Sequence, residues 1–363
     1  MKKISNMQFG SLLIILMVIM NSEINKIILL NNTGVNSWIT LIITYIIGFI
    51  PLSIFIFIGN SCGNKTLSER NKELFKGLGI VVNGIIFIIF LILGITLLYN
   101  ISQFIGSQFL YRTPLYIIAA SLMGIVLYNT SKGIATITRV GLILLVLNIF
   151  LLLISTTSLI EFFEVDNLKP FLKDGVEKIP VTSMIACTNI ILPFLLLLVI
   201  PKNKLDHPDK YVKTVIISYI IGACLSVLVV VMTLGVLGIH LEKIYEYPQY
   251  IFLKKVKFFG FLERVENIVA SQWIIGNFMY LSIIIYYLGD MITNEKKKRN
   301  FIMYGIGGFI LIVSLMIFKN NTSFDNYILK YFSYIILGLE VVYLLTLGKL
   351  GLDKFKNKNC KQE

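Results

Sequence analysis

Ten long apolar runs divide this chain of 363 residues, and they constrain its fold more than any other feature. Each run is close to the roughly 20 apolar residues that a helix needs to cross a bilayer. Within lipid only helices and closed barrels satisfy the backbone, and the short alternating strands of a barrel do not occur in this sequence. We therefore expect an all-α membrane protein, a single polytopic domain with ten transmembrane helices. The runs lie at about 9–30, 38–59, 75–99, 113–131, 139–160, 182–200, 212–238, 267–292, 300–318 and 327–348.

Composition supports a membrane protein and excludes a soluble one. The chain is 56% hydrophobic and only 15% charged, whereas soluble domains are about 45–50% apolar and about 25% charged. The formal net charge of +13 does not indicate nucleic-acid binding, because the basic residues are spread through short segments between apolar runs and form no patch in a soluble domain. The lipid bilayer is therefore the expected partner, and nucleic acid is not.

The Lys and Arg residues favour an orientation with both termini in the cytoplasm. Cytoplasmic loops of membrane proteins carry an excess of these residues. Placing the N-terminus inside puts 21 of the 33 basic residues on the cytoplasmic side. The charged run 295–299 is the clearest marker of an inner loop. The segments predicted to share that side are the N-terminus, 60–74, 132–139, 201–213, 293–299 and the C-terminal tail.

No motif in the sequence predicts catalysis, a cofactor or a metal site. The chain has no HExxH, GxSxG or P-loop sequence, and its two histidines fall in segments predicted on opposite sides of the membrane. Its four cysteines form no CxxC pair, so neither a disulfide framework nor a zinc site is indicated. We therefore expect a protein that is not an enzyme and that has no catalytic residues, metal or cofactor.

Polar residues inside apolar runs are the candidate site, because they are costly in lipid and usually face the interior of a helix bundle. The first run is interrupted by Asn21, Ser22, Glu23, Asn25 and Lys26. Glu23 and Lys26 are three residues apart and share a helix face, so they can pair. This interruption predicts a ligand or ion site at a helix break. A structural ion pair, or simply the wet outer end of the helix, explains the same residues.

Three other runs contribute candidate ligand-binding residues. The sixth run contains Thr188 and Asn189 followed by Pro193, which removes a backbone hydrogen bond and can kink the helix. Broken helices of this kind build midplane sites in transporters. Asn83 in the third run and Asn277 in the eighth are further candidates. Interhelical hydrogen bonds that only hold the bundle together explain these two asparagines equally well.

Two long segments are predicted on the outer side. Residues 161–181 are mixed and acidic. Residues 239–266 alternate apolar, aromatic and charged residues, a pattern that suits a short amphipathic helix lying on the membrane surface. A docking surface for a partner protein is the alternative interpretation of this second segment.

Four motifs are spread from the N-terminus to the eighth run. They are Ile4-Ser5-x-x-Gln8, Gly34-x-x-x-Trp38, Asn167-Leu168-Lys169-Pro170-Phe171-Leu172-x-x-Gly175, and Tyr247-Pro248 followed by Phe261-Leu262-Glu263-Arg264-x-Glu266 and Trp273. With these motifs the chain resembles, from end to end, the B subunit (GerAB-type permease subunit) of the nutrient germinant receptors of bacterial endospores. That family belongs to the amino acid–polyamine–organocation transporter superfamily, and ten helices is its count.

The chain departs from this family at two places. The family's first helix commonly has a Gly-Thr pair and a later proline, where this sequence has Ile19, Met20 and Lys26. The family's sixth helix commonly reads Phe-Pro-Phe-x-Glu, and here the stretch is 185–189, with Asn189 in place of the acid.

The resemblance implies a transporter-like bundle, compatible with a five-plus-five inverted repeat, in which helices one and six are interrupted. It implies a subunit that senses a small nutrient, typically an amino acid, and triggers spore germination. It also implies the spore inner membrane and two kinds of partner, an A-type membrane subunit and a C-type lipoprotein subunit. A stand-alone secondary amino acid transporter and a structural scaffold for the receptor complex are the alternative functions.

Overall fold

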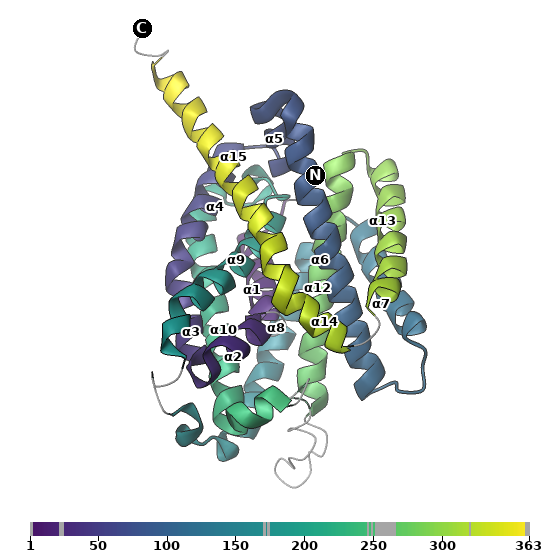
Figure 1. Ribbon diagram of the computed structural model, residues 1–363. Helices are drawn as coiled ribbons and strands as arrows, with labels where there is room; N and C mark the ends of the chain where they lie inside the picture. The colour runs from purple at the N-terminus through teal and green to yellow at the C-terminus, as the bar shows by residue number, and fades with distance from the viewer. Residues whose placement is uncertain are drawn as a thin grey trace.

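The computed structural model describes residues 3–21, 25–169, 172, 175–244, 247, 250, 266–318 and 321–359. The described residues form helices and turns without a strand, apart from one isolated parallel bridge between Ile4 and Leu205. Figure 1 shows a bundle of long helices, most of them running in the same two opposite directions. The prediction of an all-α membrane protein is therefore confirmed.

The helices follow the apolar runs in chain order. The first two runs become α1 and α2 and then α3 and α4, and a charged helix, α5, precedes the third. The α-helices are α1 (Asn6–Met20), α2 (Lys26–Thr33), α3 (Ser37–Ile47), α4 (Phe49–Cys62), α5 (Leu67–Phe75), α6 (Gly79–Gln108), α7 (Leu115–Ser131), α8 (Ile134–Leu159), α9 (Ile179–Leu197), α10 (Tyr211–Ile244), α12 (Glu266–Ile292), α13 (Lys296–Ile317), α14 (Asn321–Tyr327) and α15 (Ser333–Asn359). A π-helical turn at Ile328–Phe332 joins α14 to α15.

Seven helical stretches among the described residues are long and apolar enough to cross a membrane, and two shorter apolar helices, α1 and α7, accompany them. In the sixth run α9 stays α-helical through Pro193. After the helix, the backbone amides of residues 198–200 each donate to the carbonyl three residues earlier, the pattern of a 3-10 helix. The seven stretches are Lys26–Cys62, Leu67–Gln108, Ile134–Phe162, Val176–Leu197, Pro208–Leu241, Ala270–Ile292 and Lys296–Ile317.

Helix α1 lies at the centre of the bundle, in contact with α8, α9, α10 and α12. Its start is set by Ser5 and Gln8, which form a capping box, since the Ser5 hydroxyl accepts from the Gln8 backbone amide and the Gln8 side chain accepts from Ser5. Most of its side chains are buried, as expected for a helix that is apolar all round. Gly141 of α8 and Gly276 of α12 let these helices approach α1 closely.

Four of the segments predicted on the cytoplasmic side meet at one end of the bundle, where α5 is drawn near the top of Figure 1. The Ile4 amide donates to the carbonyl of Lys204 at 2.9 Å. The Lys202 ammonium reaches Asn60 at 2.8 Å, and Asn294 reaches Glu69 at 2.7 Å. Because four of the predicted segments contact one another in this way, they share one end of the fold.

The 60–74 segment contains a helix that the apolar pattern did not predict. Thr66 and Glu69 form a capping box at the start of α5, with the Thr66 hydroxyl accepting from the Glu69 amide and the Glu69 carboxylate accepting from Thr66. The helix lies against the start of α6. It therefore joins the second and third runs as an ordered element.

The opposite end of the bundle is closed by loops that follow α2 and α8. Gly34 ends α2 with a φ of 53°, and Gly175 has a φ of 76°, both in a region that favours glycine. The Asn167 side chain donates to the carbonyl of Gly235 on α10 at 2.9 Å. The described parts of the 161–181 segment therefore contact α10, through residues 165–168, and α2, through residues 176–178.

The predicted surface helix at 239–266 lies mostly outside the described residues. Its first part, as far as Ile244, continues α10 beyond a kink at Gly238, where φ is 66° and ψ is 163°. Tyr247 and Tyr250 are buried beside Phe104, with ring centroids 4.8 and 5.6 Å from it.

Candidate functional site

The first apolar run is broken between α1 and α2, at the polar residues that the sequence analysis singled out. Helix α1 ends at Met20, and α2 begins at Lys26. Asn21 and Asn25 lie in π-helical turns on either side of residues 22–24, which are outside the described part of the chain. The Asn21 amide donates to the Met17 carbonyl at 2.9 Å. Side-chain amides that bond to nearby carbonyls in this way compete with the regular helix ladder.

A chain of buried side-chain amides crosses this break. Asn189 on α9 donates to the amide oxygen of Asn25 at 2.5 Å. Asn25 donates to the amide oxygen of Asn21 at 2.9 Å, and Asn21 donates to the hydroxyl of Tyr45 on α3. The three asparagines are at most 2% exposed. We call Asn21, Asn25, Asn189 and Tyr45 the amide network; it links α9, the break and α3.

One acceptor of the amide network has no donor among the described residues. The Asn189 side-chain oxygen is buried, and no side chain or backbone group in the described part of the chain donates a hydrogen bond to it. An unsatisfied buried polar group costs about 1–3 kcal/mol, and such groups in native proteins call for an explanation. A ligand or water that donates a hydrogen bond here would remove that cost. Asn189 is therefore the residue of the network best placed to receive a ligand.

Thr188, the residue beside Asn189, was predicted with it as a ligand-binding residue. Its side chain is also buried, but its hydroxyl donates to the Ile185 carbonyl of its own helix at 2.7 Å. This bond is internal to α9 and does not cross the break.

Several polar residues of α3 and α10 complete the site and were not predicted from sequence. The Ser183 hydroxyl of α9 donates to the Thr40 carbonyl at 3.2 Å. The Thr44 hydroxyl donates to the Thr40 carbonyl at 2.7 Å and lies 3.5 Å from the Ser183 carbonyl. Tyr219 of α10 donates to the Tyr45 carbonyl at 2.7 Å. These bonds fix α3 against α9 and α10, and so fix the position of the Tyr45 hydroxyl.

The other predicted site residues have varied surroundings. Ser22 and Glu23 lie outside the described residues, so the proposed pairing of Glu23 with Lys26 is not part of the described structure. Lys26 begins α2 and is half-buried. Asn277 is buried on α12, where its amide donates to the Trp273 carbonyl at 3.1 Å. It follows Gly276, which packs against Ile19 in the last turn of α1.

Asn83 belongs to a different buried cluster, at the end of the bundle that carries α5. Its amide donates to the Ser68 carbonyl at 2.9 Å and accepts from Asn71 at 3.2 Å. Thr346 of α15 donates to the Asn71 side chain at 3.3 Å. These bonds hold α5, α6 and α15 together, which is the interhelical role that the sequence analysis gave as the alternative for Asn83.

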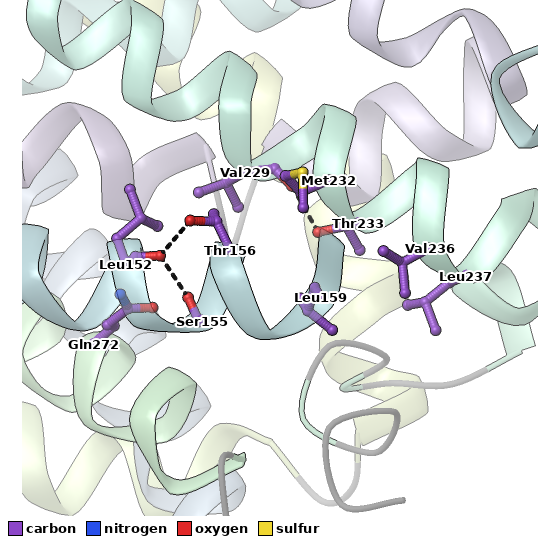
Figure 2. Close-up of a pocket in the computed structure, with 10 residues that line it drawn as sticks. All are labelled: Leu152, Ser155, Thr156, Leu159, Val229, Met232, Thr233, Val236, Leu237 and Gln272. Carbon is purple, nitrogen blue, oxygen red and sulfur yellow. Dashed lines mark hydrogen bonds between the residues drawn. The ribbon is translucent and has the colours of Figure 1, made fainter. Parts of the chain in front are cut away.

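Two small cavities are lined by residues of α8, α10 and α12, and one of them also borders α1. One lies between α8 and α10, is about 40 Å³ in volume and is shown in Figure 2. Its hydroxyls, from Ser155, Thr156 and Thr233, all bond to carbonyls of their own helices. The second is also about 40 Å³, shares Gln272 with the first and is bordered by Ile19 of α1. Each has room for water but is far below the about 300–1,000 Å³ of small-molecule pockets.

The chemistry of the site is that of binding. The described residues of the amide network are neutral amides and a phenol, groups that donate and accept hydrogen bonds. Across the described residues, no three His, Cys, Asp or Glu side chains gather in a way that holds a metal ion. These amides and the phenol can donate hydrogen bonds to a polar molecule and accept hydrogen bonds from it.

Comparison with known proteins identifies one protein family along most of the chain. The family model described as spore germination protein matches residues 3–324. Spore germination protein YndE of Bacillus subtilis is 23% identical over 293 residues, 80% of each chain. Spore germination protein KB of the same species is 27% identical over 60% of this chain and 59% of its own. Spore germination protein XB of Bacillus anthracis is 22% identical over 92% of each chain. These matches confirm the resemblance drawn from the four motifs.

Proposed function

Because this chain belongs to the spore germination protein family, we propose that it is the membrane subunit of a nutrient germinant receptor. In this proposal the protein binds a small nutrient, an amino acid, at the break between α1 and α2. Binding then triggers germination together with an A-type membrane subunit and a C-type lipoprotein subunit. The protein lies in the spore inner membrane with both termini in the cytoplasm.

The unsatisfied oxygen of Asn189 is the observation that carries the ligand assignment. An amino acid carries an ammonium group with three donors, and a buried amide oxygen is a suitable acceptor for one of them. Bonds between a charged donor and a neutral acceptor are stronger than neutral ones. At the position where the family that this chain resembles commonly has a glutamate, this chain has Asn189, whose side-chain oxygen is neutral. We therefore expect recognition of the ligand by hydrogen bonds rather than by a fixed charge pair.

In this proposal, signalling depends on a rearrangement of the helices around α1 when the ligand binds. The cavity beside α1 and its neighbour between α8 and α10 are both too small for an amino acid, so a ligand that enters must favour a second arrangement of the helices. A ligand shifts such an equilibrium by its difference in affinity for the two states. Because α1 contacts α8, α9, α10 and α12, a change at its end is passed to four helices, and through them to surfaces that partner subunits contact.

The test is a germination assay paired with a transport assay. Spores that lack this gene, and spores complemented with it, are exposed to single amino acids, and the loss of optical density is followed. We expect the response to at least one amino acid to be lost in the deletion and restored by the complement. Purified protein in vesicles should bind that amino acid without moving it. Steady uptake of the labelled amino acid would favour the transporter, and a normal response in the deletion spores would refute the receptor role.

A further inference from the structure

A groove at the end of the bundle that carries α5 combines two lysines with an apolar wall. It lies between the start of α6 and the end of α12 and has a volume of about 540 Å³, far more than either of the two small cavities described above. Lys72 and Lys76 border it on the α5 side, and Ile80, Phe87 and Ile292 line it along α6 and α12. It is separate from the amide network, and what it binds does not depend on the proposed nutrient site.

The positive charges of this groove are not neutralised by the acids nearby. Glu73 pairs with Lys65 and Arg70. Asp290 pairs with Arg299, and Glu69 accepts from Asn294. Among the described residues no carboxylate pairs with Lys72 or Lys76.

The Lys72 ammonium points toward the groove. It lies 3.5 Å from the Met291 carbonyl, which is on the opposite wall. The groove therefore presents two lysine charges, which are the electrostatic complement of a phosphate.

The apolar wall continues directly from these lysines into the membrane-spanning part of α6. Ile80 is 71% exposed and Ile292 is 52% exposed, although both lie where the chain passes from a charged segment into an apolar helix. Gly84 widens the wall, since a Cβ added there would meet no atom within 4 Å. Cationic groups above an exposed apolar wall match the layout of a phospholipid, with its phosphate at the interface and its chains below.

We propose that this groove binds an anionic phospholipid, with the headgroup phosphate on Lys72 and Lys76 and an acyl chain along Ile80, Phe87 and Ile292. The lipid would fasten the α5–α6 corner to the end of α12. Among the described residues, the hydrogen bonds that join this corner to the end of α12 and the turn after it include Lys72 to the Met291 carbonyl and Asn294 to Glu69.

The test measures lipid binding to the purified full-length protein by native mass spectrometry, with phosphatidylglycerol and phosphatidylcholine as probes. The wild-type protein should retain phosphatidylglycerol in preference to phosphatidylcholine. A basic side chain near an anionic lipid surface contributes about fivefold to binding. Lys72→Gln with Lys76→Gln should therefore weaken phosphatidylglycerol binding about 25-fold. Gly84→Leu, which fills the groove, should weaken it while both lysines remain.

Matched controls separate this site from general attraction. Lys296→Gln with Lys297→Gln removes two exposed lysines from the same end of the bundle. Gly305→Leu adds a side chain in open space on α13. Neither control should change the retained lipid. Equal loss in a control and in the groove variants would overturn the proposal, and so would unchanged binding in both groove variants. Displacement of the lipid by inorganic phosphate alone would also overturn it, because the acyl chain would then contribute nothing.

Discussion

The side-chain amide of Asn189 on α9 donates to the amide oxygen of Asn25, 2.5 Å away, across the break in the first apolar run. Both side chains are completely buried. Replacing Asn189 by Ala removes this bond and also the unsatisfied oxygen that we assign to the ligand. We expect the nutrient concentration for half-maximal germination to rise at least about tenfold, which corresponds to about 1.4 kcal/mol of lost interaction.

Asn129→Ala is the matched control for Asn189→Ala. Asn129 is a buried asparagine on α7 whose amide donates to the Ser282 hydroxyl at 3.1 Å, outside the amide network. The Asn129→Ala substitution removes one interhelical hydrogen bond of the same kind. It should therefore lower thermal stability without changing the germination dose response. Identical dose–response curves for Asn189→Ala and wild-type spores would remove the site assignment.

Two of the fully buried tyrosines, Tyr219 and Tyr287, should respond in opposite ways to loss of their hydroxyls. The Tyr219 hydroxyl donates to the Tyr45 carbonyl at 2.7 Å, whereas the Tyr287 hydroxyl has no hydrogen-bond partner among the described residues. Tyr219→Phe should destabilise the fold by about 0.5–1.5 kcal/mol, the net value of a typical hydrogen bond. Tyr287→Phe should be neutral or stabilising, because it removes a polar atom from an apolar site.

The measurement for this pair is the thermal unfolding midpoint in one detergent. Because the substitutions are chemically identical, a difference between them reports the hydrogen bond alone. A larger drop in the midpoint for Tyr287→Phe than for Tyr219→Phe would contradict the hydrogen bonding of both residues.

The sequence predicted the fold best where the thickness of the bilayer determines the structure. Membrane thickness fixes the length of an apolar run, so the order and type of the helices followed from the sequence. The helix ends were predicted less accurately, because a helix can continue through polar residues that the fold buries. The third run was predicted to end near residue 99, but α6 continues to Gln108. Ser102 and Phe104, in this extension, are almost completely buried.

The site was predictable only in part. Asn21 and Asn189 stood out because amides are costly in lipid. Tyr45 and Tyr219 did not, since tyrosine is ordinary in an apolar helix. Which asparagines meet depends on helix rotation and on contacts distant in sequence, so the period of the apolar pattern did not separate Asn83 from the network. Helix α5 had a readable signal, the capping box of Thr66 and Glu69.

Gly79 and Gly77, two residues apart, should differ sharply in their tolerance of alanine. A Cβ at Gly79 would lie 2.6 Å from the Asn71 carbonyl oxygen and 2.7 Å from the Lys72 Cα, so the α5 backbone would have to move. A Cβ at Gly77 would meet no atom within 4 Å. Gly79→Ala should cost about 1–3 kcal/mol, as overpacking does, and Gly77→Ala should be neutral.

Size-exclusion chromatography after a heat step measures the folded fraction of each glycine variant. The folded fraction of Gly79→Ala should fall at a lower temperature than that of the wild type. Equal curves for the two variants would show that α5 does not approach α6 as closely as the structure places it.

Two ion pairs at the turn between α12 and α13 should contribute very differently to stability. Arg299 lies 3.1 Å from Asp290, with side chains 13% and 9% exposed, and its guanidinium is 4.8 Å from the Tyr286 ring centroid. Lys298 lies 2.8 Å from Glu295, with side chains 72% and 55% exposed. Asp290→Asn leaves a buried guanidinium without its counter-charge, which costs about 3–5 kcal/mol. Glu295→Gln breaks an exposed pair and should cost at most about 1 kcal/mol.

A double variant distinguishes loss of the buried pair from loss of a needed side chain. Replacing Asp290 by Leu together with Arg299 by Met removes both charges and keeps apolar volume, so stability should recover much of what Asp290→Asn loses. The thermal midpoints of the single and double variants, measured in the same detergent at low and high salt, provide the comparison. The cost of Glu295→Gln should shrink in high salt, because exposed pairs are screened and buried ones are not. If Asp290→Asn cost no more than Glu295→Gln, the Asp290–Arg299 pair would not be buried as the structure describes it.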